Sequence, residues 1–237
     1  MKASEIMTPE VITVSPDTSV ADLARTMMEN RISGVPVVQN GRLVGIVSEG
    51  DLLRRIEMGT ERRRSRWLEF FTSGATLAED YVKSHGKRAS DVMTEDVITI
   101  DVDTPVPGIA DTMESRHIKR LPVLQGEKLV GMVSRANLIQ ALASRATEPA
   151  KSSRIDDEAI REAVWQEISA QPWMSSLLHT NVIVSDGVVH LWGFVWNDEE
   201  RKAIVVAARN IPGVKDVEDH LEFHIVGHPP IYNVIGV

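Results

Sequence analysis

Apolar residues in the first part of the chain recur with two different spacings. Val11–Val14 is a short apolar run that predicts a strand. Asp17–Ser19 offers side-chain oxygens that cap helices, and the spacing of one helical face follows at Val20, Leu23, Ala24, Met27 and Met28. Two more apolar runs, Val35–Val38 and Leu43–Val47, flank an Asn-Gly pair that favours a tight β-turn. With a helix after Ser48, the pattern predicts a β-α-β-β-α order.

The same pattern returns later in the chain. Ser4–Leu53 aligns with Ser90–Ile139 without a gap, and roughly 22 of the 50 aligned positions are identical. The second copy starts its helix at Thr104-Pro105, a cap followed by the proline that suits the first helical position. One copy is too thin to bury both faces of its sheet, so we expect the two copies to pack together.

Each copy ends in the same strand-to-helix corner, GIVSEGD at Gly45–Asp51 and GMVSRAN at Gly131–Asn137. The spacing fits a capping box, in which the serine and the Asp or Asn satisfy free amides at the helix start. The same groups suit a ligand, because a helix N-terminus attracts phosphate and an Asp one turn on can accept both hydroxyls of a ribose. The two interpretations are compatible, since the corner can cap when empty and bind when occupied.

The segment between the copies, 57–88, breaks the pattern. Its basic run Glu61–Arg66 precedes the large apolar residues Trp67, Leu68, Phe70 and Phe71. This predicts a helical insertion with a solvated basic face and an aromatic stripe docked on the core. The alternative is a basic patch for phosphate or nucleic acid. The insertion separates a first domain, 1–56, from a second, 89–145, and a small polar linker at 146–153 follows.

A different pattern begins after the linker and predicts an α-β-β-α-β domain over 154–226, followed by a tail at 227–237. Its elements are expected at Asp156–Ala170, Asn181–Val184, Val188–Trp196, Asp198–Asn210 and Val214–Val226. Asp186-Gly187 marks the hairpin, and Asp198 is expected to cap the second helix. The predicted fold class is α+β, with a tandem β-α-β-β-α pair and a small α-β-β-α-β domain.

Composition narrows the functional classes. The 237 residues are 43% hydrophobic and 25% charged, as in folded globular proteins. The absence of cysteine excludes disulfides, thiolate catalysis and cysteine-based zinc sites. Met1–Val11 lacks the apolar core of a secretory signal and no apolar run could span a bilayer, so we expect a cytoplasmic protein. A net charge of −8 argues against nucleic acid as a partner. No nucleophile–base constellation or phosphate-binding glycine loop is visible, so we expect no enzyme.

The paired motifs MTPEVITV/MTEDVITI, GVPVV/RLPVL and GIVSEGD/GMVSRAN resemble a tandem pair of cystathionine-β-synthase-type (CBS) domains, from Met1 to about Leu142. The resemblance implies a pseudo-twofold pair with two clefts for adenine nucleotides, and further association into a homodimer. It implies that Ser48 and Asp51 hold phosphate and ribose in one cleft, and Ser134 and Asn137 in the other. The adenine would meet the backbone at Thr13, Val14, Thr99 and Ile100, beside Val35, Pro36, Leu121 and Pro122.

The charged residues near the two corners differ, and this difference predicts which cleft binds phosphate better. Glu49 beside Ser48 would oppose a phosphate, whereas Arg135 beside Ser134 would attract one. The second copy also has His117, Lys119 and Arg120 where the first has Arg31, Ser33 and Gly34. Because a charge-assisted hydrogen bond is about twice as strong as a neutral one, we expect phosphate beside Arg135. Asn137, however, lacks the carboxylate that best holds two hydroxyls, and an ordinary solvated helix end is the alternative for the basic residues.

The carboxy-terminal stretch VIVSDGVVHLWGFVWNDEERKAIVVAARNIPGVKDVEDHLEF resembles a BON domain, which would extend from Ser153 to about Ile225. The family is linked to phospholipid or envelope association. About 6 basic against 13 acidic residues in this segment would repel an anionic membrane, so we do not expect membrane association.

Strand parity separates two faces in this domain. Val189, Leu191, Gly193 and Val195 are expected beneath the helices, which leaves His190, Trp192, Phe194 and Trp196 on the other face, near His220, Glu222 and His224. Aromatic side chains on an open face require a cover, which we expect to be a protein surface, either the CBS pair or a partner subunit. A lipid or other ligand is one alternative. A histidine metal site is another, but no ligand-defining spacing is visible, so we expect no metal.

Together these observations predict a regulatory sensor. The CBS pair would bind AMP, ADP, ATP or NAD, or S-adenosylmethionine, and pass a change of domain arrangement to the BON domain or its unknown protein partner. The alternative is a ligand-independent scaffold with vestigial clefts, in which the BON domain mediates partner or phospholipid association.

Overall fold

The computed structural model describes residues 1–53, 59, 81–144, 154–174 and 180–223. The chain divides into two compact units. The central unit is Pro9–Val133, and the split unit joins Met1–Thr8 to Ser134–Val237. The division falls between Val133 and Ser134, within the second copy. The predicted linker 146–153, the run Glu61–Arg66 with its aromatic neighbours and the tail 227–237 lie outside the described residues.

The first copy in the central unit contains a helix, a hairpin and a short helix. These are α2 (Val20–Glu29), β1 (Gly34–Gln39), β2 (Arg42–Ser48) and α3 (Glu49–Leu52). Ser19 caps α2 as expected, since its side chain accepts from the amide of Asp22. The predicted strand Val11–Val14 is wrong: only Val14 bridges to Val37 of β1, with hydrogen bonds on both sides of it. Residues 11–13 belong to no strand.

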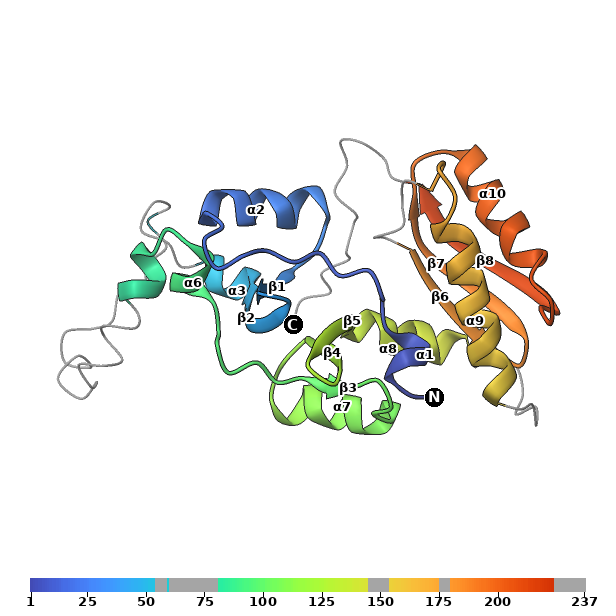
Figure 1. Cartoon of the computed structure of the whole chain (residues 1–237), viewed down its shortest axis with the longest axis horizontal. Coiled ribbons are helices and arrows are strands. Elements are labelled where there is room, and N and C mark those ends of the chain that lie inside the picture. Colours follow the sequence, from blue (N-terminus) through green and yellow to red (C-terminus); the bar gives the residue numbers. More distant parts are fainter. Residues whose placement is uncertain (54–58, 60–80, 145–153, 175–179, 224–237) are drawn as a thin grey trace. The chain divides into compact units, whose positions relative to one another are not determined.

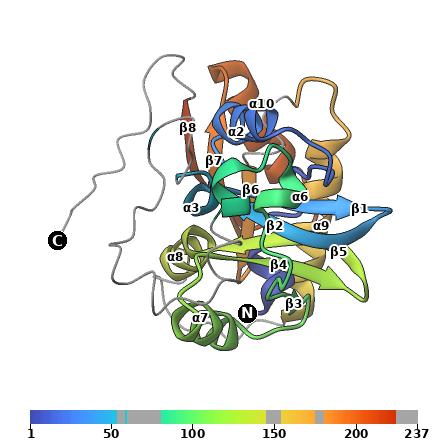
Figure 2. The same ribbon diagram turned by 90° about the vertical axis from the view of Figure 1, so that its left-hand side faces the viewer.

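The second copy repeats this arrangement. It contains α6 (Ala89–Val92), β3 (Ile100–Asp101), α7 (Val106–Ser115), β4 (Arg120–Gln125) and β5 (Lys128–Ser134). The strand β3 pairs parallel with β4, and β5 completes this three-stranded sheet (Figure 2). Pro105 is itself the N-cap of α7, not the first helical residue, since its carbonyl accepts from the amide of Ile109. The Thr104 hydroxyl accepts from the amide of Asp101.

The turn of the first hairpin depends on left-handed backbone. Asn40 and Gly41 have φ of 52° and 78°, the combination that a two-residue turn with both central residues in the left-handed region requires. Asp186 and Gly187 repeat it in the other unit, with φ of 54° and 80°. The Asn-Gly and Asp-Gly signals in the sequence are therefore confirmed.

The two copies share one core in the central unit. Leu23, Val35, Val37 and Val47 of the first copy are fully buried together with Ala89 and Val92 of α6. Ile46 of β2 forms a bridge with Thr94, and Met93 packs so closely over Gly45 that a Cβ there would overlap its side chain. This close approach places the start of the second copy beside the strand-to-helix corner of the first.

The split unit contains a three-stranded sheet with two helices on one face (Figure 1). Its elements are α9 (Arg154–Ser169), β6 (Thr180–Ser185), β7 (Val188–Val195), α10 (Asp198–Arg209) and β8 (Asp216–Phe223). The strand β7 is central, antiparallel to β6 and parallel to β8. As predicted from parity, Val189, Leu191 and Val195 point into the core beneath the helices. Asn197, not Asp198, caps α10, because its side chain accepts from the amide of Glu200.

Two helices from the CBS segments belong to the same unit, α1 (Ala3–Ile6) and α8 (Arg135–Ala143). The buried side chain of Arg161 on α9 donates to the carbonyl oxygens of Val182 at 2.8 Å and Met7 at 2.7 Å. The Asn181 side-chain amide donates to Gln140 Oε1 of α8 at 2.9 Å. These bonds hold the first residues of the chain and α8 against β6.

Candidate functional site

A pocket of about 400 Å³ opens in the central unit beside the first corner. Its walls come from the corner itself, from the loop after α6, and from the segment that leads into β4. Ligand pockets of this size hold small organic molecules. The residues that line it are Ser33, Ile46, Ser48, Glu49, Gly50, Asp51, Thr94, Asp96, Val97, Ile98, His117, Ile118, Lys119, Arg120 and Pro122.

Within the pocket, Ser48 and Asp51 bind one another. The Asp51 carboxylate accepts from the Ser48 amide at 2.8 Å and from the Ser48 hydroxyl at 2.7 Å. This is the capping arrangement that the spacing predicts, and it holds the carboxylate at the pocket wall. Asp51 has further acceptor capacity, because an ionised carboxylate offers about four lone-pair directions.

Arg120 reaches the same pocket by crossing to the first copy. Its guanidinium donates to the hydroxyl of Ser33 and passes over Gly34, where a Cβ would overlap it. Burial lowers the pKa of Arg120, and the nearby carboxylates of Glu49 and Asp51 act in the opposite direction. Arginine nevertheless stays protonated in proteins, so the pocket holds a fixed cation close to two carboxylates.

Two further basic residues line this pocket beside Arg120. Lys119 is exposed, and His117 sits at the left-handed position that ends α7, with φ of 54°. The sequence favours these three residues as support for phosphate at the second corner, beside Arg135. In the structure they line the pocket at the first corner.

Only some of the residues expected around adenine lie at the pocket. Pro122 lines the pocket, but Val35 and Leu121 are fully buried in the core. Pro36 and Ile100 are also buried, Val14 is partly buried, and Thr13 is exposed while Thr99 is partly so. Thr94, Val97 and Ile98 also line the pocket, although the MTEDVI segment in which they lie indicated only the repeat and no ligand contact. The bridge between Ile46 and Thr94 brings that segment to the first corner.

The second corner belongs to the split unit and repeats the capping arrangement. The Ser134 amide and hydroxyl both donate to Asn137 Oδ1 at 2.7 Å. Asn137 is buried, and its Nδ2 donates to Thr8 Oγ1 at 3.4 Å. The neighbouring Arg135 is exposed. The amide of Asn137 therefore takes part in packing that the carboxylate of Asp51 does not make.

Comparisons with known proteins identify two domain families in this chain. The CBS domain family matches residues 3–58 and 89–144, and the BON domain family matches residues 156–224. The uncharacterised protein MJ1426 of Methanocaldococcus jannaschii is 32% identical over 154 residues, which are 60% of this chain and 91% of that protein. This chain belongs to the CBS domain family. It carries a BON domain after its CBS pair.

Two plant relatives add structural detail. CBSX1, a chloroplastic CBS domain-containing protein of Arabidopsis thaliana, is 31% identical over 139 residues, which cover 54% of this chain and 57% of that protein. A crystal structure of CBSX2 in complex with AMP superposes with a TM-score of 0.53 at 29% identity. The match covers 60% of this chain and 96% of CBSX2 in that crystal. Both matches leave more than a third of this CBS protein unaccounted for.

The BON domain has a second cluster of predicted site residues on the face of its sheet away from α9 and α10. His190 is buried there, Trp192 and Phe194 are partly buried, and Trp196 just beyond β7 is 42% exposed. The Trp192 indole donates to Ser144 Oγ at 3.3 Å, directly after α8. Within the split unit, part of the predicted partner surface is therefore covered by the chain's own CBS-derived segments.

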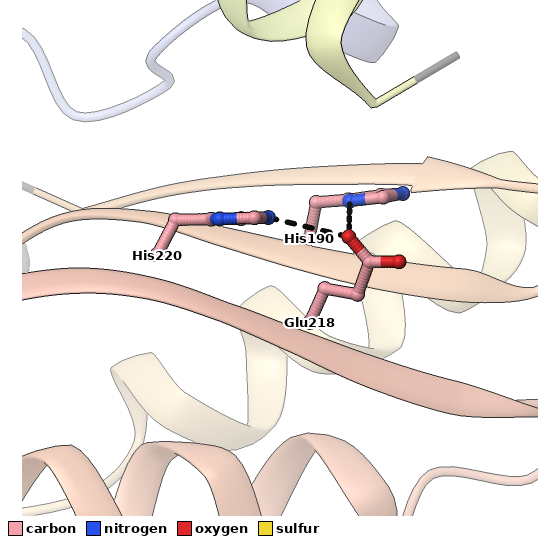
Figure 3. A group of neighbouring side chains, drawn as sticks. All are labelled: His190, Glu218 and His220. Atoms are coloured by element: carbon pink, nitrogen blue, oxygen red, sulfur yellow. Dashed lines mark ion pairs between the residues drawn. The ribbon is translucent and has the colours of Figure 1, made fainter. Parts of the chain in front are cut away.

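His190 shares this face with two residues of β8, Glu218 and His220 (Figure 3). Burial lowers the pKa of His190. The Glu218 carboxylate acts in the opposite direction, and His220 adds to the lowering. A histidine with a pKa below its usual value of about 6.5 is neutral at neutral pH.

The residues that the structure describes contain no helix long and apolar enough to cross a membrane.

Proposed function

We propose that this CBS protein is a regulatory sensor whose pocket at the first corner binds an adenine nucleotide. The observation that carries the proposal is the composition of that pocket, where three carboxylates (Glu49, Asp51 and Asp96), three basic side chains and apolar walls line about 400 Å³. A nucleotide needs these three kinds of surface for its ribose, its phosphate and its base. The AMP complex of CBSX2 supports the choice of ligand class.

The pocket chemistry suggests a role for each wall. Asp51 is suited to accept from the ribose hydroxyls, because one carboxylate can receive both. Lys119 and His117 are suited to the phosphate, with Arg120 as a fixed cation behind them. Ile46, Ile98 and Pro122 offer apolar surface for the base. Phosphate at the second corner beside Arg135 stays a separate prediction for a second nucleotide.

Calorimetric titration of the purified chain with AMP, ADP, ATP, NAD and S-adenosylmethionine identifies the ligand. Asp51→Asn is the most informative variant, because Asn137 shows that an amide can make the same capping bonds. It should keep the fold and weaken binding by roughly 10- to 100-fold, the worth of a hydrogen bond to a charged group. Unchanged affinity in this variant would remove Asp51 from the site.

Charge reversals separate the two corners. Lys119→Glu should weaken nucleotide binding at the first corner by about tenfold or more, since it opposes the phosphate. Lys128→Glu, an exposed residue of β5 outside the pocket lining, is the matched control and should leave affinity unchanged. If Arg135→Glu weakens the tightest binding instead, the second corner is the main site.

We further propose a non-catalytic role in which the nucleotide biases the arrangement of the CBS pair in a cytoplasmic homodimer. A ligand shifts a conformational equilibrium only through different affinities for the two states. The BON domain would report that shift to a protein partner. Comparing small-angle scattering of the chain with and without saturating nucleotide tests this step, and identical curves would contradict it.

A ligand-independent scaffold remains the second candidate, because Ser48 and Asp51 already satisfy one another in the corner. A corner with a purely structural role needs no nucleotide. Absence of heat with every nucleotide in the calorimetric panel would favour this function over the sensor.

A further inference from the structure

Three potential metal ligands meet on the face of the BON sheet away from α9 and α10. His190 lies on β7 directly opposite Glu218 of β8, and His220 follows two residues later on the same face (Figure 3). Because side chains alternate along a strand, this register makes all three point the same way. The sheet thus supplies the ligand spacing that the linear sequence lacks.

The distances in this cluster suit one small cation. His190 Nδ1 lies 3.2 Å from Glu218 Oε2, and His220 Nε2 lies 3.4 Å from the same oxygen. All three ligand atoms lie within 4.8 Å of one another. A tetrahedral zinc ion with bonds of about 2.0–2.1 Å places its ligands about 3.3–3.4 Å apart, so two of the three edges already have the right length.

Two buried ring nitrogens of this cluster lack a well-formed hydrogen bond. Within the described residues, His190 Nδ1 and His220 Nε2 each lie at ion-pair distance from Glu218 Oε2 but are left unsatisfied by hydrogen-bond criteria. The His190 residue as a whole is 5% exposed. Buried polar atoms are normally hydrogen-bonded, and each exception requires an explanation. A bound cation would accept both nitrogen lone pairs.

One ring is also held in place by its neighbours. The Trp192 ring stacks on His220 with centroids 3.9 Å apart and an angle of 13° between the planes. The two imidazoles are nearly parallel, with 6° between them. Ligands on rigid strands with fixed rings lose little freedom when a metal binds.

We propose that His190, Glu218 and His220 bind one divalent transition-metal ion of the zinc class. Two imidazoles and one carboxylate select zinc and its neighbours over magnesium or calcium, which prefer oxygen ligands. Three protein ligands leave the fourth tetrahedral position to water. The site lies in the split unit, outside the proposed nucleotide pocket, so each proposal can fail without the other.

The test is a titration of the metal-free chain with zinc chloride against a competing chromophoric chelator. The unmodified chain should compete for one zinc ion per chain. Cobalt chloride should then give the visible absorption of a tetrahedral site and be displaced by zinc. Failure to compete for zinc would overturn the proposal.

Two variants locate the site. His220→Gln and Glu218→Gln change partly exposed side chains, whose exposed fractions are 33% and 49%, so both are expected to fold. Each should weaken zinc binding by more than about tenfold, since even an outer-shell change costs that much. Glu222→Gln, on the same strand and face but outside the cluster, is the matched control and should bind zinc normally.

The outcomes are distinct when folding is checked by circular dichroism without metal. Zinc binding that His220→Gln and Glu218→Gln leave unchanged would overturn the proposal, as would an equal loss in Glu222→Gln. Loss confined to the two cluster variants, in chains that remain folded, would support it.

Discussion

At the scale of single residues, the unequal pair Gly34 and Arg120 explains how the first corner acquires its charge. The two residues occupy corresponding places in the repeat, and the guanidinium of one fills the space that the missing side chain of the other leaves. Glycine is needed at position 34 for this close approach, not for its backbone angles. The cation is thereby held beside Ser33 and the pocket.

Gly34→Ala should therefore displace the Arg120 side chain. We expect a loss of about 1–3 kcal/mol in the free energy of unfolding, from overpacking, together with weaker nucleotide binding. Gly108→Ala is the matched control, because its Cβ would come no closer than 3.9 Å to Thr104. In helix α7 that change should be neutral or stabilise by up to about 1 kcal/mol. Urea unfolding of both variants checks this, and equal stability would contradict it.

His190 makes the stability of the chain depend on pH. Its pKa is lowered in the folded state by burial, so the unfolded chain binds more protons in the window below about 6.5. Stability from this residue is present above that value and decreases as pH falls through the window. Metal-free chain should melt at a lower temperature at pH 5.5 than at pH 7.5, and His190→Gln should reduce the difference. Glu218 and His220 face the ring, so both stay unchanged in this comparison.

At the scale of elements, most helices and hairpins follow from local pattern. The Asn-Gly and Asp-Gly turns, the alternation in β7 and the cap of α2 were predicted from adjacent residues and are confirmed. The prediction of a strand at Val11–Val14 was wrong, because an apolar run does not show whether a neighbouring strand is present for it to pair with. The residues that line the pocket could not be predicted from local sequence either, since Thr94 and Lys119 reach the first corner only through packing between the two copies.

Arg161 connects three elements of the split unit, α9, β6 and the segment after α1. Burial lowers its pKa to about 10, so it remains charged at neutral pH while donating to the carbonyls of Val182 and Met7. Arg161→Ala leaves both carbonyls without this donor and should cost about 2–3 kcal/mol. It should also speed amide exchange in residues 1–8. Arg209→Ala, at the exposed end of α10, should change stability by less than about 0.5 kcal/mol, and equal effects would contradict the account.

At the scale of the whole molecule, the repeat predicted the CBS pair and the change of pattern after it predicted the BON domain. Sequence could not predict that α1 and α8 would belong to the same unit as the BON sheet, because this depends on buried contacts such as Arg161 to Met7. Nor could it identify the His190 cluster, whose members become neighbours only through strand register.

The proposed homodimer can be tested on α8. Ile139 and Leu142 are 65% and 69% exposed, which is costly for two large apolar side chains on one helix. Leu142→Glu should convert a dimer into a monomer in light scattering after size exclusion. Val206→Glu, at an apolar site on α10 that is 55% exposed, should leave the mass unchanged. A mass unaffected by Leu142→Glu would place any dimer contact elsewhere.

The proposed sensor requires that the pocket at the first corner receives an adenine nucleotide. The most direct measurement is a titration of isotope-labelled chain with AMP, followed by amide NMR signals. We expect saturable shifts at Gly50, Thr94 and Ile98, which line that pocket, with much smaller shifts in β6–β8. Unchanged signals for these three residues at saturating AMP, ATP and NAD would contradict the proposal.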